Sequence, residues 1–171
     1  MKSAGRFVQT LSSAAVAMAA TFGFTAGQAS AGDINSAVNT AARIIGPGVL
    51  AVLDVNGSAA GTDLVVFTPG AAELAVFFNA ECSVDSLSDG TYLAIDILVD
   101  GVLIPPTGID RAFCTGTGDN ALQHWVSAEA NVYRVVPAGN HLVRVRAQLV
   151  AEGAGDNGRI DDTSLLVIEN P

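Results

Sequence analysis

Hydrophobic and polar positions alternate through the middle of the chain. Every second residue of Leu74–Val84 is apolar or cysteine, and acidic, amide or hydroxyl side chains fill several positions between them. The alternation resumes in Thr91–Val99, after a segment rich in turn-forming residues at 85–90. A period of two is typical of a strand with one buried face. The two runs therefore predict two β-strands.

A tight turn is expected directly after the second run. Asp100-Gly101 suits a type I′ turn, because both central residues of this turn need a positive φ. We therefore expect Thr91–Val99 to pair antiparallel with Val102–Ile104. Pro105-Pro106 should end the second arm, since proline cannot donate a hydrogen bond to the ladder.

Further strands are predicted on both sides of this hairpin. His141–Glu152 has the most one-sided pattern, because apolar residues alternate with arginine and glutamine. Ser164–Ile168 is apolar on both faces, which predicts a central strand. Seven to ten short strands separated by turns favour an all-β fold, an antiparallel β-sandwich of jelly-roll-like form. The remaining predicted strands are Val49–Val55, which ends at a turn signal in Asn56-Gly57, Asp63–Thr68 and Leu122–Val136.

The N-terminal region has a different pattern. Lys2 and Arg6 precede an uncharged run of small and apolar residues that ends at Ala29-Ser30-Ala31. These features are typical of a secretory signal peptide with an A-x-A cleavage site. Serine, threonine and glycine interrupt the run, which disfavours a transmembrane anchor. We predict a signal peptide over residues 1–31.

Two units are predicted after the signal peptide. Residues 32–48 form a lead-in segment in which Ile34, Val38, Ala41 and Ile45 recur at helical spacing behind an N-cap at Asp33. This pattern predicts a short helix or a loosely held segment. Residues 49–171 form a single β-sandwich domain, and they contain no internal repeat.

The chain is strongly acidic. Eight lysines and arginines oppose seventeen acids, a formal charge of −9, and removal of the predicted leader leaves six arginines and a charge of −11. Such a charge disfavours nucleic acid and anionic membrane surfaces as partners. No later stretch resembles a membrane span. We expect a secreted or periplasmic protein.

The two cysteines predict a disulfide. Cys82 lies among the apolar positions of its strand and Cys114 follows Phe113. Cysteines of an exported chain usually pair, because the compartment is oxidising. A reactive thiol or half of a metal site would need a neighbouring histidine or a further cysteine pair, which the sequence does not provide.

The catalytic motifs of common hydrolases and phosphate-binding enzymes are absent from the sequence. It contains no Gly-x-Ser-x-Gly, no His-Glu-x-x-His and no glycine-rich phosphate loop. His124 and His141 are the only imidazoles, and we interpret both as hydrogen-bonded structural residues. A glycosidase pair such as Asp96 with Glu129 stays open, although the spacing does not select it over other carboxylates. The protein is therefore predicted not to be an enzyme.

We predict no cofactor, and calcium is the alternative, because acidic residues lie in the turns. Their carboxylates and neighbouring carbonyls are the oxygen ligands that hard cations require, although no EF-hand loop is present. The other interpretation is that these residues only stabilise their own turns. The candidates are Asp85, Asp89, Asp119, Asp156, Asp161 and Asp162.

Three aromatic residues are candidates for ligand binding. Trp125, Tyr92 and Tyr133 could line a sugar-binding face, because aromatic rings stack on the apolar faces of sugars. Packing in the core is the alternative for the same residues.

The C-terminal half resembles known protein families. The Asp100-Gly101 hairpin, the turn and strand at Pro137–Val145 and the closing strand at Ser164–Val167 resemble uncharacterised secreted bacterial β-sandwich proteins. They are less closely similar to jelly rolls of the C1q and tumour-necrosis-factor type. The resemblance covers Leu74–Ile168, and it implies a fold and no activity.

A sandwich pattern without a catalytic constellation predicts a non-catalytic binding or surface-interaction module. Its partner would be a glycan or a protein. The alternative is a structural subunit of an extracellular assembly, a homo-oligomer in which an exposed edge strand pairs with the next copy. A secreted hydrolase is the third hypothesis.

Overall fold

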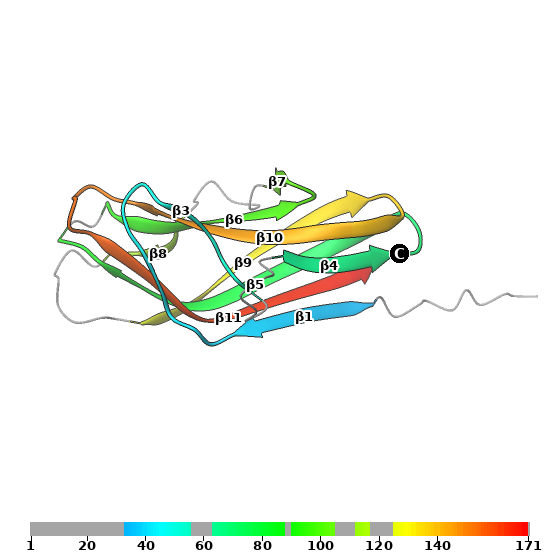
Figure 1. Cartoon of the computed structure of the whole chain (residues 1–171), viewed down its shortest axis with the longest axis horizontal. Coiled ribbons are helices and arrows are strands. Elements are labelled where there is room, and N and C mark those ends of the chain that lie inside the picture. The colour runs from blue at the N-terminus through cyan, green and yellow to red at the C-terminus, as the bar shows by residue number, and fades with distance from the viewer. Residues whose placement is uncertain (1–32, 56–62, 88–89, 105–111, 117–124, 171) are drawn as a thin grey trace, which may run out of the picture.

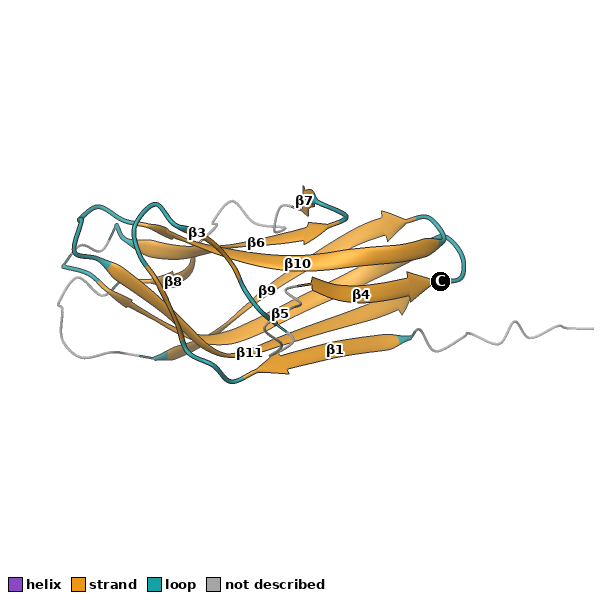
Figure 2. Cartoon of the chain, viewed as in Figure 1, coloured by secondary structure: helices purple, strands orange, loops and turns teal. Residues whose placement is uncertain are grey.

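The computed structural model describes residues 33–55, 63–87, 90–104, 112–116 and 125–170. Over these residues the chain forms eleven strands in two antiparallel sheets and no helix (Figure 2), which confirms the predicted all-β sandwich. In this part of the chain there is no helix long and apolar enough to cross a membrane. The predicted turn at Asn56-Gly57 lies outside the described residues.

The five-stranded sheet has the order β1-β11-β5-β9, and β2 also pairs with β11 (Figure 1). β11 lies between β1 and β5, which confirms the central position expected from its apolar pattern. The bounds of its strands are β1 Ile34–Asn39, β2 Arg43–Ile45, β5 Ala72–Asp85, β9 Val126–Val136 and β11 Asn157–Asn170.

The six-stranded sheet has the order β3-β10-β6-β7, with β4 paired to β10 and β8 paired to β6. The long strands β6 and β10 run antiparallel at its centre, from Val143 opposite Val99 to Val150 opposite Tyr92. The bounds of its strands are β3 Leu50–Val52, β4 Asp63–Thr68, β6 Tyr92–Val99, β7 Val102–Ile104, β8 Ala112–Thr115 and β10 Gly139–Val150.

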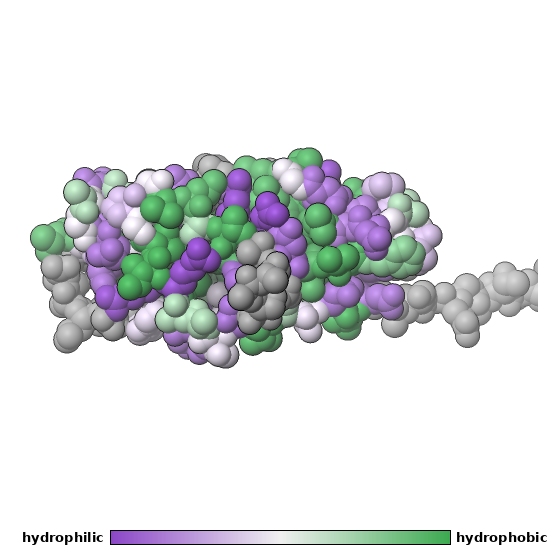
Figure 3. All heavy atoms as spheres, in the orientation of Figure 1, coloured by the Kyte–Doolittle hydropathy of each residue, from purple (hydrophilic) through white to green (hydrophobic). Residues whose placement is uncertain are grey.

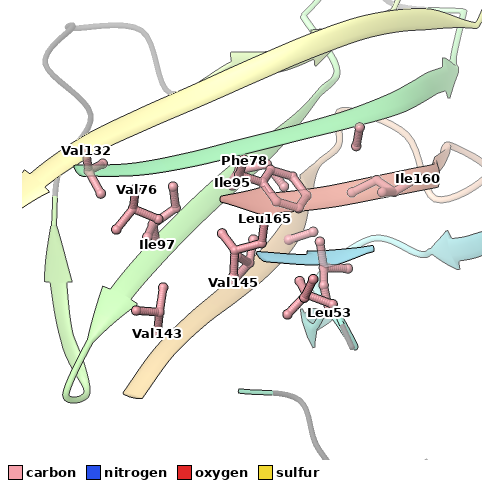
Figure 4. Packing of buried hydrophobic residues seen from close by; sticks show 14 of the residues in the cluster. Leu53, Val76, Phe78, Ile95, Ile97, Val132, Val143, Val145, Ile160 and Leu165 are labelled. Atoms are coloured by element: carbon pink, nitrogen blue, oxygen red, sulfur yellow. The ribbon is translucent and has the colours of Figure 1, made fainter. Parts of the chain in front are cut away.

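The core fills the space between the two sheets. Figure 4 shows side chains from both sheets pointing toward one another, with Phe78 and Leu165 near the centre. The alternation of Leu74–Val84 is confirmed, since Leu74, Val76 and Phe78 are fully buried. Burying such side chains stabilises the fold by about 1.5–3 kcal/mol each relative to exposure.

The predicted hairpin is confirmed at the end of β6. Val99 pairs with Val102, and the turn residues Asp100 and Gly101 have φ values of 54° and 76°. Both are positive, as a type I′ turn requires. This turn fixes the carboxylate of Asp100 at one end of the β6–β10 pair.

The helical expectation for the lead-in is wrong. Ile34–Asn39 forms β1 and Arg43–Ile45 forms β2, and both strands pair with β11. Ile34 and Val38 would share a helical face, but in β1 they point outward, and Ala37 is buried opposite Leu165. A short isolated helix is only marginally stable, whereas a strand here satisfies the edge of β11.

The predicted disulfide between Cys82 and Cys114 is confirmed. The two Cα atoms are 6.2 Å apart, and both residues are buried. Cys82 lies in β5 of the five-stranded sheet and Cys114 in β8 of the six-stranded sheet. The bridge therefore joins the two sheets across the core.

Candidate functional site

One part of the outer face of the five-stranded sheet is apolar. Cross-strand register places Ile34, Ile168, Ala75 and Tyr133 in one row across four strands. In the next outward-facing row, Leu166 lies beside Phe77, and polar Ser36 and Asn131 stand at the two ends. We call this surface the apolar face. It comprises Ile34, Val38, Ala75, Phe77, Tyr133, Val135, Leu166 and Ile168.

Several side chains of the apolar face are exposed. The exposed fraction is 67% for Ile34, 64% for Val38, 72% for Val135 and 47% for Tyr133. The rings of Phe77 and Tyr133 meet edge to face, with centroids 6.3 Å apart. Within the described residues, no strand or turn packs over this surface, since its outermost side chains keep these exposures. Large exposed apolar patches occur at interaction sites, so this surface is the candidate site, and Ala75 within it is only 3% exposed.

The apolar face ends at an irregularity in β11. The pairing with β5 shifts register between Asp161 and Ser164, and Asp162 has a φ of 44°. Beyond this bulge the same side of the sheet is polar, because Arg159 forms an ion pair with Asp85 at 3.0 Å. The bulge therefore separates an apolar part of the sheet from a charged part.

The outer face of the six-stranded sheet carries cross-strand ion pairs. Arg144 donates two hydrogen bonds to Asp63, of 2.7 and 2.8 Å, and Arg146 pairs with Asp96 at 3.0 Å. These hydrogen bonds from Arg144, together with the charge of Asp63, raise the pKa of Arg144. Exposed Val65 pairs with Leu142 at one corner of this face. Figure 3 shows hydrophobic patches over β3 and β4 with hydrophilic residues between them.

A polar cluster at one end of the β6–β10 pair surrounds His141. Its Nδ1 lies 2.8 Å from Asp100 Oδ2 and its Nε2 lies 2.9 Å from the carbonyl oxygen of Pro137. Both partners can only accept, so the geometry is fully satisfied when both ring nitrogens carry a proton. Asp100 also accepts a hydrogen bond from the Leu142 N–H. The cluster joins the β6–β7 turn to the turn between β9 and β10.

The pKa values of this pair move apart. Burial lowers the pKa of His141, but its hydrogen bonds to Asp100 and Pro137 and the charge of Asp100 raise it more, so the net shift is upward despite nearby Arg134. Burial likewise raises the pKa of Asp100, and its hydrogen bonds from His141 and Leu142 reverse the effect, so the net shift is downward. With both ring nitrogens bonded, His141 is a structural residue, as predicted, and is not arranged as a general base. His124 lies outside the described residues.

A second polar cluster lies at the opposite end of the same strand pair. The buried Thr91 hydroxyl donates to Asp156 Oδ2 at 2.7 Å and accepts from the Glu152 N–H at 3.2 Å. The Gly153 N–H also donates to Asp156 Oδ2, at 2.9 Å. The hydrogen bond from Thr91, followed by that from Gly153, holds the pKa of Asp156 below its ordinary value. This cluster joins the start of β6 to the turn that precedes β11.

The predicted metal ligands do not form a common site. Asp85 is paired with Arg159, Asp156 is bonded to its own turn, and Asp161 accepts the N–H of exposed Asp162. Asp89 and Asp119 lie outside the described residues. Within the described ranges, no group of three histidine, cysteine or acidic residues could hold a metal ion. Asp156 stabilises its own turn, and calcium binding stays the untested alternative.

The predicted aromatic residues lie on separate surfaces. Tyr92 is half-buried and pairs with outward-facing Val150 in the six-stranded sheet, whereas Tyr133 belongs to the apolar face of the other sheet. Trp125 precedes β9 and is 38% exposed. Tyr92 and Tyr133 therefore do not contribute to one sugar-binding face.

The carboxylates of the considered glycosidase pair are also separated. Asp96 is bonded to Arg146 on the outer face of the six-stranded sheet, and Glu129 lies on the outer face of the five-stranded sheet, opposite Asn79. Two carboxyl groups on opposite sides of a sandwich cannot flank one glycosidic bond. This arrangement gives no catalytic pair.

A shallow cavity of about 210 Å³ lies beside the bulge of β11. Its polar groups already bond to the fold. Asn39 donates to the carbonyl of Asp54, Thr163 donates to the carbonyl of Asn39, and Arg43 donates to the carbonyl of Val52. These hydrogen bonds hold β1 and β2 against the remainder of the sandwich. The cavity is lined by Asn39, Ala41, Ala42, Arg43, Leu53, Asp54, Ile160 and Thr163.

Comparisons with known proteins do not assign a family. No family model matches the chain, and no curated protein matches it. Similar solved structures include the Eiger tumour-necrosis-factor protein of S. frugiperda, with 11% identity and a TM-score of 0.42 over 79% of this chain and 92% of that one. They also include the catalytic domain of a GH87 α-1,3-glucanase, with 18% identity, a TM-score of 0.31 and coverage of 81% and 28%.

A third similar structure is dimeric latent PorU of Porphyromonas gingivalis, with 15% identity and a TM-score of 0.34 over 84% of this chain and 14% of that one. These similarities are too low to carry an argument about function. No family match supports the predicted resemblance to secreted bacterial proteins. For the tumour-necrosis-factor type, the comparison finds only a distant structure that is also a β-sandwich.

Proposed function

We propose that this protein is an exported, non-catalytic surface-interaction module that binds a protein partner through the apolar face. The single observation behind the proposal is the row Ile34, Ile168, Ala75 and Tyr133, which continues across four strands. A sheet with one face in water normally presents alternating polar residues on that face. A protein surface suits the apolar face better than a glycan, because a glycan requires convergent hydrogen-bonding groups.

The non-catalytic part of the proposal rests on the acid and imidazole groups. Both ring nitrogens of His141 are hydrogen-bonded, and the carboxylates of Asp96 and Glu129 lie on opposite outer faces. Export is supported by the disulfide, because cysteines pair and persist in oxidising compartments.

Two matched variants test this function. The exported protein is screened against a glycan array and against purified extracellular and envelope proteins, and each interaction is repeated with Val135→Asp and Val65→Asp. Both valines are exposed, but only Val135 belongs to the apolar face. We expect Val135→Asp to weaken a protein interaction at least about tenfold, a loss of about 1.4 kcal/mol, while Val65→Asp leaves it unchanged. Turnover of a sugar or ester substrate, or interactions insensitive to Val135→Asp, would overturn the proposal.

A further inference from the structure

We infer that removal of the predicted signal peptide completes the fold, because the new α-ammonium group of Gly32 pairs with the buried carboxylate of Glu169. The inference rests on the export part of the proposed function, and it does not depend on the apolar face. It makes cleavage between Ala31 and Gly32 a step that stabilises the sandwich. The burial of Glu169, the commitments of the arginines and the position of Asp33 each support it.

Glu169 occupies a core position near the end of β11. Every second residue of this part of the strand is buried, in the order Leu165, Val167 and Glu169, and the exposed fraction of Glu169 is 5%. Among the described residues, the carboxylate of Glu169 has no hydrogen-bond or ion-pair partner. An ionised carboxylate that is buried without a partner is strongly unfavourable. This position therefore needs a cation.

The basic side chains of the described ranges do not supply this cation. Arg134 lies in the same row as Glu169, with Leu74 between them, but its guanidinium donates to the carbonyl oxygen of Val99 in the other sheet, at 3.2 Å. Lysine is absent from the chain after Lys2. Each remaining basic side chain in this part of the protein is bonded to another group. These pairs are Arg43 with the carbonyl of Val52, Arg144 with Asp63, Arg146 with Asp96, Arg159 with Asp85 and His141 with Asp100.

The start of the processed chain lies beside Glu169. The Glu169 N–H donates to the carbonyl oxygen of Asp33 at 3.1 Å, which continues the pairing of Ile34 with Ile168 at the start of β1 and the end of β11 (Figure 1). Hydrogen-bonded residues that oppose one another in antiparallel strands have Cα atoms about 5.5 Å apart. Gly32 directly precedes Asp33, so covalent geometry keeps the Gly32 nitrogen within about 5 Å of the Asp33 Cα atom. This nitrogen is therefore within reach of the Glu169 carboxylate.

Cleavage changes the charge of this nitrogen. Water hydrolyses the Ala31–Gly32 peptide bond, in a reaction that a signal peptidase catalyses, and leaves a carboxylate on Ala31 and an ammonium group on Gly32. Before cleavage, the same nitrogen belongs to a neutral amide. An α-amino group is largely protonated at neutral pH. The processed chain therefore gains an ion pair with Glu169 that the precursor lacks.

Selective acetylation tests the pair directly, because the α-amino group is the only amine of a chain that begins at Gly32. Mass spectrometry of the exported protein first establishes that it begins there. An amine-reactive acetyl ester then modifies the native protein and the urea-unfolded protein. We expect the native protein to react at least about tenfold more slowly, because an ammonium group paired with a carboxylate retains its proton. Glu169→Gln should remove this protection, and Glu129→Gln, an exposed carboxylate on the outer face of the same sheet, is the matched control.

Urea unfolding measures what the pair contributes to stability. Acetylation should raise the equilibrium constant of unfolding about tenfold, which corresponds to about 1.4 kcal/mol. Glu169→Gln should destabilise the chain with a free amino group. In the acetylated chain, the same substitution should be neutral or stabilising, because it replaces an unpaired buried charge with a neutral amide. Glu129→Gln should have the same effect in both chains.

Four outcomes would overturn the inference. An exported protein that retains its leader or begins elsewhere would remove the ammonium group from this position. An effect of Glu169→Gln that is equal in the free and acetylated chains would show that the two groups do not interact. Loss of that effect in Arg134→Gln instead of on acetylation would make Arg134 the partner, and protection lost only in Asp33→Asn would place the ammonium group on Asp33. Binding of a protein partner through the apolar face is decided separately by Val135→Asp.

Discussion

The two ends of the β6–β10 pair are held by different chemistry. At one end Thr91 and Asp156 join two turns through a neutral hydroxyl, and at the other His141 and Asp100 join two turns through an ionisable ring. The Thr91 end is also close to the disulfide, because Cys114 pairs with Leu93. The two ends should therefore differ in how much they contribute to stability and in how that contribution changes with pH.

The sign of each pH response follows from the pKa shifts. His141 has a raised pKa, so its contribution is fully present below its ordinary value of 6.5 and is lost as the pH rises through the higher folded value. Asp156 has a lowered pKa, so its contribution is present above 3.8 and is lost as the pH falls through the lower folded value. Asp100 behaves as Asp156 does. Between neutral and mildly alkaline pH, only the His141 end should loosen.

The largest expected effect comes from removing the covalent link near the Thr91 end. Replacing both Cys82 and Cys114 by serine should lower the free energy of unfolding by about 2–5 kcal/mol, because the bridge restricts the unfolded chain. Urea unfolding of the oxidised wild type and the double variant measures this loss. Two alkylated cysteines in the folded, unreduced protein would contradict the bridge.

Removing the Thr91 hydroxyl should have the next largest effect. Thr91→Val keeps the shape of the side chain but removes the buried hydrogen bond to Asp156 and one acceptor of the Glu152 N–H, which also bonds Asp156. We expect a loss of about 1–3 kcal/mol. Thr91→Ser retains the hydroxyl and serves as the matched control. Equal stability of the valine and serine variants would show that packing, and not hydrogen bonding, fixes this end.

Much of the fold could be predicted from the sequence, because strands and tight turns are determined by residues that are close together in the chain. The period of two in Leu74–Val84, the Asp100-Gly101 turn and the buried register of Cys82 each depend on a few neighbouring residues. The lead-in could not be assigned, because Ile34 and Val38 fit both a helical spacing and one side of a strand. Only the long-range pairing with β11 decided between them.

The apolar face could not be recognised from the sequence. Ala75 and Phe77 interrupt the polar side of β5, and in the sequence they are simply two more apolar residues within a buried strand. Ile34, Ile168 and Tyr133 become their neighbours only through the register of three strand pairs. Register between strands that are distant in sequence is a property of the folded chain. The sequence signal for this face was that β11 has apolar residues on both of its sides. This pattern predicted only that β11 lies at the centre of a sheet.

The smallest expected effect concerns the His141 end, and its signature is pH dependence. His141→Phe keeps an aromatic ring but removes both hydrogen bonds, so it should cost about 1–2 kcal/mol at about pH 6. The difference from wild type should shrink as the pH rises through the raised pKa of His141, because the wild-type ring then loses its proton and one of its acceptor contacts. Melting curves of both proteins across this range give the comparison. His124→Gln is the control for the second histidine, and Thr91→Val should keep a constant deficit over the same range. If the deficit of His141→Phe also stayed constant, the ring would not change its charge over this range, and the two ends would not differ in their response to pH.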